Sequence, residues 1–142
     1  MAVVIDQQTE SAIREEGRTS YPHECCGFLV GRLEQGARRI ARMVPVANAR
    51  EDEAKHNRYL ITPELFMKTE RQAREKGLDV LGFYHSHPDA PARPSTFDTD
   101  HAWPWYAYII VSIQQGKAEK MTAWVLQDDR ARFNEIPITI ED

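Results

Sequence analysis

The chain has 142 residues, 42% of them hydrophobic and 28% charged, which predicts one globular domain spanning residues 1–142. Its formal net charge of −4 at pH 7, with no block of basic residues, argues against a nucleic-acid partner. No apolar run is long enough to cross a membrane, and the N-terminus lacks the basic head and apolar stretch of a secretory signal.

The first third of the chain predicts a strand, a helix and a hairpin. Residues 3–5 form the short strand, and a polar, helix-forming run over residues 7–17 ends before the sequence YPHE. Residues 25–48 have the alternation of a β-hairpin. The hairpin begins with Cys25 and Cys26, which are neighbours and cannot build a disulfide framework, so we expect a protein of the reducing cytoplasm.

The rest of the chain alternates between strand and helix patterns. Residues 58–77 predict a strand that runs into a helix, with Thr62 as N-cap, Pro63 in the first turn and Gly77 at the end. Further strands are predicted at residues 79–87, 106–113 and 120–127, with a last edge strand at residues 135–140. Strands outnumber helices, and helices interrupt them. This order predicts an α/β fold with a single curved mixed β-sheet flanked by helices.

The stretch HSHPDAPARPSTFD, residues 85–98, concentrates possible metal ligands in a short segment. His85 and His87 are two residues apart in a predicted strand, so their imidazoles point to the same face. Catalytic zinc usually takes three protein ligands and keeps a fourth position open. Asp98 is the candidate third ligand, because Ser95 and Asp98 have the spacing of a helix N-cap and its N3 residue. A short helix that begins near Ser95 would hold the carboxylate against the two histidines.

Plainer interpretations exist for each of these residues. Two histidines in a strand can be ordinary polar residues of one face, and Ser95 with Asp98 can be a helix cap alone. His101 and Cys26 could also approach such a site, although a surface role for the histidine and a packing role for the cysteine are more common. Other metal sites fit poorly: amidohydrolase barrels need a longer chain, and zinc deaminases need a Pro-Cys-x-x-Cys sequence that is absent.

Two sequence motifs resemble those of a known family. HSHP-x6-S-x2-D, ending in Ser95 and Asp98, is similar to the JAMM motif of the JAMM/MPN+ (Mov34/MPN/PAD-1) zinc metallopeptidases, in their compact stand-alone prokaryotic form. Upstream, ECCGFLVG resembles the family's Glu-x-Cys-Gly sequence, with Glu24 as its glutamate. The motifs cover residues 22–31 and 81–98, and none of the five motif positions departs from the family pattern.

The resemblance implies an MPN/JAMM fold and a role for each motif residue. His85, His87 and Asp98 would hold one Zn²⁺ ion. Glu24 would be the general base, taking a proton from the zinc-bound water and passing it to the leaving amine. Ser95 would donate a hydrogen bond to the carbonyl oxygen as that oxygen gains negative charge.

The resemblance also implies a substrate class. The expected bonds are peptide or isopeptide bonds after the C-terminal Gly-Gly of ubiquitin-like proteins or small sulfur-carrier proteins. An extended Gly-Gly tail suits a narrow groove because it has no side chains to clash. Two other functions remain open at this point: a zinc peptidase acting on small or cell-wall peptides, and an MPN-type interaction module without catalysis.

Overall fold

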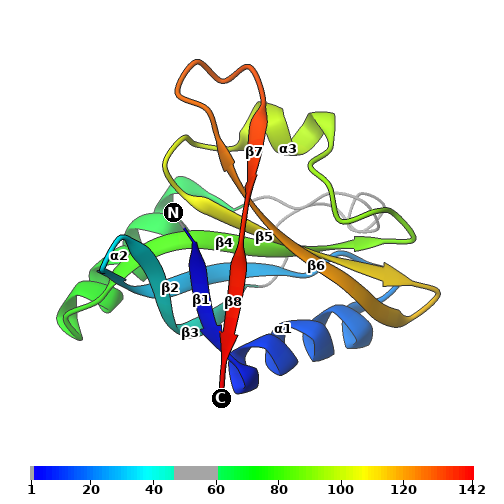
Figure 1. Ribbon diagram of the computed structural model, residues 1–142, viewed down its shortest axis with the longest axis horizontal. Coiled ribbons are helices and arrows are strands. Elements are labelled where there is room, and N and C mark those ends of the chain that lie inside the picture. The colour runs from blue at the N-terminus through cyan, green and yellow to red at the C-terminus, as the bar shows by residue number, and fades with distance from the viewer. Residues whose placement is uncertain (1, 47–60) are drawn as a thin grey trace.

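In the computed structural model, which describes residues 2–46 and 61–142, eight strands form one curved mixed sheet (Figure 1). The strands are β1 (Val3–Asp6), β2 (Cys26–Glu34), β3 (Ala37–Val46), β4 (Asp79–Pro88), β5 (Ala107–Gln114), β6 (Lys117–Leu126), β7 (Phe133–Ile136) and β8 (Ile138–Glu141). The helices are α1 (Gln7–Ser20), α2 (Pro63–Glu75) and α3 (Thr96–His101). The predicted fold class is confirmed.

Strand β4 lies in the middle of the sheet, whose order is β7-β6-β5-β4-β2-β3-β1-β8. It pairs antiparallel with β2 and parallel with β5. Residues 80–87 of β4 are all buried, because both faces of a central strand are covered. The end of this strand carries the two histidines of the predicted metal site.

The two faces of the sheet bury separate apolar clusters. Neighbouring residues of β4 show the division: Tyr84 packs in the cluster that includes Ile13 of α1, and Phe83 packs in the cluster that includes Ala73 of α2. Side chains alternate across a strand, so each face of the sheet receives its own helix. His85 and His87 lie on the face of Phe83, which is the face of α2.

Helix α1 runs one turn beyond the predicted end at residue 17. Gly17 does not stop it because this glycine is buried between the helix and the sheet. A Cβ built there would lie 2.8 Å from Cδ1 of Ile113 in β5, so only glycine lets the helix approach this closely. Packing of the helix against the sheet, rather than helix propensity, therefore explains why a glycine stands at position 17.

The single edge strand predicted at residues 135–140 is wrong. The segment forms two strands separated by Pro137: β7 pairs with β6 at one edge of the sheet, and β8 pairs with β1 at the other. Figure 1 shows the two strands following one another across the front of the molecule. The sheet curves far enough for one segment to reach both edges, and the Val3 backbone N–H donates to the Pro137 carbonyl at 3.0 Å.

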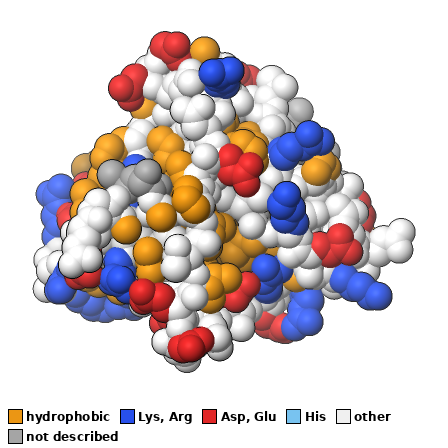
Figure 2. Space-filling model, in the orientation of Figure 1, with side chains coloured by type: hydrophobic (Ala, Val, Ile, Leu, Met, Phe, Trp, Pro, Cys, Tyr) orange, Lys and Arg blue, Asp and Glu red, His pale blue; other side chains and the backbone are white. Residues whose placement is uncertain are grey.

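The other predicted elements agree with the structure where it describes them. The hairpin is β2 and β3, and α2 begins after an N-cap at Thr62, whose Oγ1 accepts the Leu65 N–H at 3.2 Å. The strand expected before α2 falls mostly on residues 47–60, outside the described ranges. Among the described helices, none combines the length and apolar character needed to cross a membrane. On the face seen in Figure 2, Lys and Arg side chains are mixed with Asp and Glu.

Candidate metal centre

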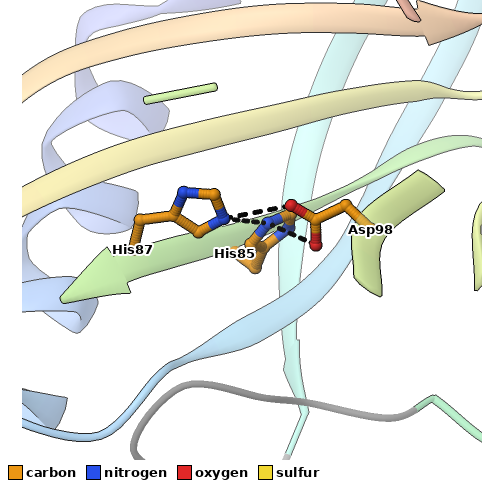
Figure 3. Close-up of side chains that lie close together, drawn as sticks. All are labelled: His85, His87 and Asp98. Carbon is orange, nitrogen blue, oxygen red and sulfur yellow. Dashed lines mark hydrogen bonds and ion pairs between the residues drawn. The ribbon is translucent and has the colours of Figure 1, made fainter. Parts of the chain in front are cut away.

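His85 and His87 lie near the C-terminal end of β4 and point to the same face of the sheet (Figure 3). Their Nε2 atoms are 3.1 Å apart. Both residues are buried, with 1% and 7% of their surface exposed. Two buried imidazoles at this separation need a partner that satisfies both rings, and a carboxylate from another element supplies it.

Asp98 reaches the histidines from α3. Ser95 is the N-cap: its Oγ accepts the Asp98 N–H at 3.1 Å, and Asp98 Oδ2 accepts the Ser95 N–H at 2.8 Å. This reciprocal pair is the capping box expected from the spacing. The same carboxylate places Oδ1 3.3 Å from His85 Nε2 and Oδ2 3.1 Å from His87 Nε2. The cap therefore holds the carboxylate against both rings.

The three side chains fit a zinc ion. One ligand atom from each of His85, His87 and Asp98 lies within 4.8 Å of the others, and the three residues are buried. Zinc bonds of about 2.0–2.1 Å in a tetrahedral arrangement put ligand atoms roughly 3.3 Å apart. The two Nε2 atoms, 3.1 Å apart, are close to that spacing, and each of them lies beside one oxygen of the Asp98 carboxylate. Two imidazoles and one carboxylate are also the donor set of a catalytic zinc site with an open position.

Hydrogen bonding selects the metal-binding form of His87. Its Nδ1 lies 2.8 Å from the carbonyl oxygen of Pro91. A carbonyl can only accept, so Nδ1 carries the proton and the neutral ring has its lone pair at Nε2. A metal-binding histidine commonly donates its second N–H to a carbonyl in this way.

The pKa shifts favour a neutral imidazole beside an ionised carboxylate. Burial lowers the pKa of His85. Burial acts to raise the pKa of Asp98, but the neighbouring His85, His87 and the Ser95 N–H outweigh it and hold the pKa of this carboxyl well below its usual range. Metal ligands must be deprotonated, so both shifts prepare the site for a cation.

Glu24 and Ser95 line the pocket beside this cluster. Glu24 precedes β2 in the chain and is buried, whereas Ser95 is exposed at the start of α3. The residues that line the pocket are Glu24, His87, Pro88, Ala90, Pro91, Arg93, Pro94 and Ser95. The structure thus brings together all five residues singled out in the sequence, on three segments of the chain.

Ser86 is a residue whose contribution the sequence does not reveal. It points away from the histidines, and its Oγ accepts the backbone N–H of Cys25 at 2.9 Å. Its own N–H donates to the Cys25 carbonyl at 3.1 Å. These two hydrogen bonds join Cys25, the residue after Glu24, to the point of β4 that lies between the two histidines. A polar residue predicted on the buried side of a central strand is the signal that could have indicated this role.

Cys26 packs close to the site without the features of a ligand. It is the cross-strand partner of His85 and has no exposed surface. Burial raises the pKa of its thiol well above the usual range, so the thiol keeps its proton. The packing role weighed for Cys26 agrees with this burial. The side chain of His101 lies outside the described part of the structure.

Comparisons with known proteins place this fold and site in a family. Residues 6–127 match the family described as prokaryotic homologues of the JAB domain. The chain is 33% identical over 132 residues to a desampylase of Haloferax volcanii, covering 92% of this chain and 88% of that protein. It is 33% identical over 89 residues to a probable TtuB-protein conjugate cleaving protease of Thermus thermophilus, covering 63% of this chain and 55% of that protein.

Solved structures share the whole fold. A solution structure of a Desulfitobacterium hafniense protein superposes with a TM-score of 0.84 at 26% identity, covering 100% of this chain and 94% of that one. A crystal structure of a JAB1/MPN domain protein from Archaeoglobus fulgidus gives a TM-score of 0.61 at 17% identity, with full coverage of both chains, and shows the shared fold alone.

Fold, motif positions and family match agree, and the chain belongs to the prokaryotic homologues of the JAB domain. The resemblance to stand-alone JAMM/MPN proteins is confirmed.

Proposed function

We propose that this chain is a zinc-dependent hydrolase of peptide or isopeptide bonds that follow the C-terminal Gly-Gly of a ubiquitin-like or sulfur-carrier protein. The observation that carries the proposal is the convergence of His85, His87 and Asp98 beside a pocket lined by Glu24 and Ser95. The relatives support the reaction, since one is a desampylase and another a probable protease that cleaves protein conjugates.

The ion would be held by His85, His87 and Asp98 and, when bound, would acidify a water molecule and polarise the scissile carbonyl. Glu24 takes the proton of the attacking water and delivers it to the leaving nitrogen. Because Glu24 is buried, the proton passes directly between its carboxylate and the reacting atoms rather than through bulk solvent.

Ser95 acts on the other side of the scissile bond. Its Oγ already accepts the Asp98 N–H, so the hydroxyl proton points elsewhere and can be donated to the carbonyl oxygen. The cap and the catalytic role therefore use different parts of the same hydroxyl group.

The pocket also bears on the substrate. The body of a folded carrier is too wide to enter it, but an extended tail without side chains can reach the cluster while the body stays outside. Main-chain hydrogen bonds to such a tail would supply affinity. Gly-Gly is the tail that meets this requirement at the scissile bond.

The proposal is tested by changing the tail. Ubiquitin and a small sulfur-carrier protein, each joined through its terminal Gly-Gly to an amino acid or to a lysine side chain, are incubated with the zinc-loaded protein. We expect cleavage directly after Gly-Gly, and loss of cleavage when both glycines are replaced by leucines or when a zinc chelator is added.

Other outcomes would favour the other functions. Equal cleavage of native and substituted tails contradicts the tail argument. Hydrolysis of short peptides, with no cleavage of any Gly-Gly adduct, would indicate a general zinc peptidase. Binding of a carrier without any cleavage by the zinc-loaded protein would indicate an interaction module.

A further inference from the structure

Arg93 lines the same pocket as Glu24 and Ser95. Of the pocket-lining residues in the described part of the chain, it is the one with a permanent positive charge. Its side chain is exposed, and no acidic side chain among the described residues forms an ion pair with it. The pocket therefore presents a guanidinium whose donors are available to a bound molecule.

The loop that carries Arg93 is held in place by side chains of two strands. Ser112 Oγ of β5 donates to the Ala90 carbonyl at 2.6 Å, and Thr122 Oγ1 of β6 donates to the Ala92 carbonyl at 2.7 Å. Ala92 itself is only 5% exposed. The base of the Arg93 side chain is therefore fixed relative to the pocket, which lowers the entropy lost when it binds a ligand.

An exposed guanidinium at this place can bind an anion, and the carrier side of the scissile bond offers none. The last residues of the tail are glycines, whose carbonyls and amides carry no net charge. The leaving group differs: when the carrier is joined to the α-amino group of an amino acid, a free α-carboxylate lies next to the scissile nitrogen. A lysine side chain in an isopeptide bond carries its nitrogen at the end of an uncharged methylene chain.

Building on the proposed function, we infer that Arg93 recognises the α-carboxylate of the leaving group and that the preferred substrates are carrier–amino acid adducts. Hydrolysis breaks the amide C–N bond, leaves the water oxygen in the new carrier carboxylate and returns the amino acid with a free amine. The planar guanidinium binds the α-carboxylate through two parallel N–H···O hydrogen bonds. Arg93 is thus a residue of specificity, and Glu24 and Ser95 act on the reacting atoms.

The test compares two adducts of one carrier. Either ubiquitin or the small sulfur-carrier protein, whichever the zinc-loaded protein cleaves faster, is joined after Gly-Gly to alanine or to alaninamide. Alanine has a free α-carboxylate, and alaninamide has none. We expect the wild-type protein to cleave the alanine adduct with a kcat/KM about tenfold higher. Arg93→Ala should cleave the alanine adduct with a kcat/KM about tenfold lower than the wild type and so lose this preference, and Arg93→Lys should keep part of it. Arg71→Ala, on the exposed surface of α2, is the matched control and should retain the full preference.

Each other result overturns the inference in a distinct way. Equal rates for the two adducts, or an unchanged preference in Arg93→Ala, contradict the role of Arg93 and leave the proposed function standing. Cleavage of lysine isopeptide adducts in strong preference to the alanine adduct does the same. If the zinc-loaded wild type cleaves no Gly-Gly adduct at all, the proposed function fails and this inference fails with it.

Discussion

At the scale of single residues, Asp98 does two things with one carboxylate. It caps α3 by accepting the Ser95 N–H, and it meets both histidine rings. A short helix has little stability of its own, so the reciprocal cap is what fixes the carboxylate in place. This double use explains why Ser95 and Asp98 have the spacing of a helix cap within the predicted metal-binding motif.

Asp98→Ala tests the ligand assignment. Removing one of three ligands should lower zinc affinity by roughly 10²-fold or more, since even residues that only orient ligands change affinity by about 10–100-fold. Metal per chain is measured by elemental analysis after dialysis, together with a competition titration. Asp100→Ala, an exposed carboxylate of the same helix, is the control and should bind zinc as the wild type does. Full stoichiometry and affinity in Asp98→Ala would show that the assignment is wrong.

Glu24→Gln separates catalysis from metal binding. The amide cannot take a proton, so kcat should fall by roughly 10²-fold or more while zinc content and thermal stability stay unchanged. The measurement pairs turnover of a Gly-Gly adduct with metal analysis of the same sample. A Glu24→Gln protein with wild-type turnover would contradict the general-base role.

Ser95→Ala should lose a similar factor, roughly 10²-fold in kcat, through weaker stabilisation of the carbonyl oxygen. It should also lose about 1 kcal/mol of unfolding free energy, because the N-cap is removed. Ser95→Thr keeps an N-cap hydroxyl and serves as the control for stability, measured by chemical denaturation. An alanine variant with normal turnover would leave Ser95 with the cap alone.

At the scale of elements, helix α1 is joined to the sheet by a partly buried polar contact. The hydroxyl of Tyr84, in the fully buried part of β4, donates to Oε1 of Glu16. Burial raises the pKa of Glu16 above the ordinary value of 4.5, although the Tyr84 hydrogen bond acts in the opposite direction. Burying this carboxyl group against the sheet therefore costs less free energy when it is protonated, whereas the Tyr84 hydrogen bond is stronger when it is ionised.

Glu16→Gln should flatten the dependence of stability on pH. The folded chain binds the Glu16 proton more tightly than the unfolded chain, so this contribution is fully present below pH 4.5 and is lost as the pH rises through the raised folded pKa. The glutamine keeps an oxygen for Tyr84 and has no proton to lose. Melting temperatures are measured from acidic to neutral pH, with Glu15→Gln, an exposed neighbour, as control. A drop in stability over this range that is as steep in Glu16→Gln as in the wild type would contradict the expectation.

At the scale of the whole molecule, the C-terminal segment joins the two edges of the sheet. Strand β8 covers β1 with four paired residues, from Val3 opposite Ile138 to Asp6 opposite Glu141. Without β8, the edge of β1 would present unpaired backbone groups next to buried apolar side chains. The candidate metal centre lies on β4 and α3, away from this edge.

Removal of residues 138–142 should therefore lower the melting temperature by roughly 5 °C or more, because backbone pairing and partly buried apolar surface are lost. Zinc affinity should change little, since β4 and α3 keep their contacts. Removal of Asp142 alone is the control. A truncated protein that melts like the wild type would show that β8 adds no stability.

The parts of this protein that depend on local spacing could be predicted from the amino-acid sequence. A strand period of two residues is enough to put His85 and His87 on one face, and the N-cap spacing is enough to place Asp98 at the start of a helix. The helix boundary at Thr62 and Pro63 has the same origin. These patterns act between residues close in the chain, so they hold whatever the rest of the fold does.

The features that depend on contacts between distant residues follow from the folded structure and could not be predicted from local patterns. Glu24, identified in the sequence through its family motif, comes to the pocket because β2 pairs with β4 and sets Cys26 opposite His85. The division of residues 133–141 between two edges follows from the curvature of the sheet, and Gly17 lies inside α1 because Ile113 packs against it. Strand partners and helix–sheet contacts join residues far apart in sequence, and their free energy comes from burial that no local period encodes.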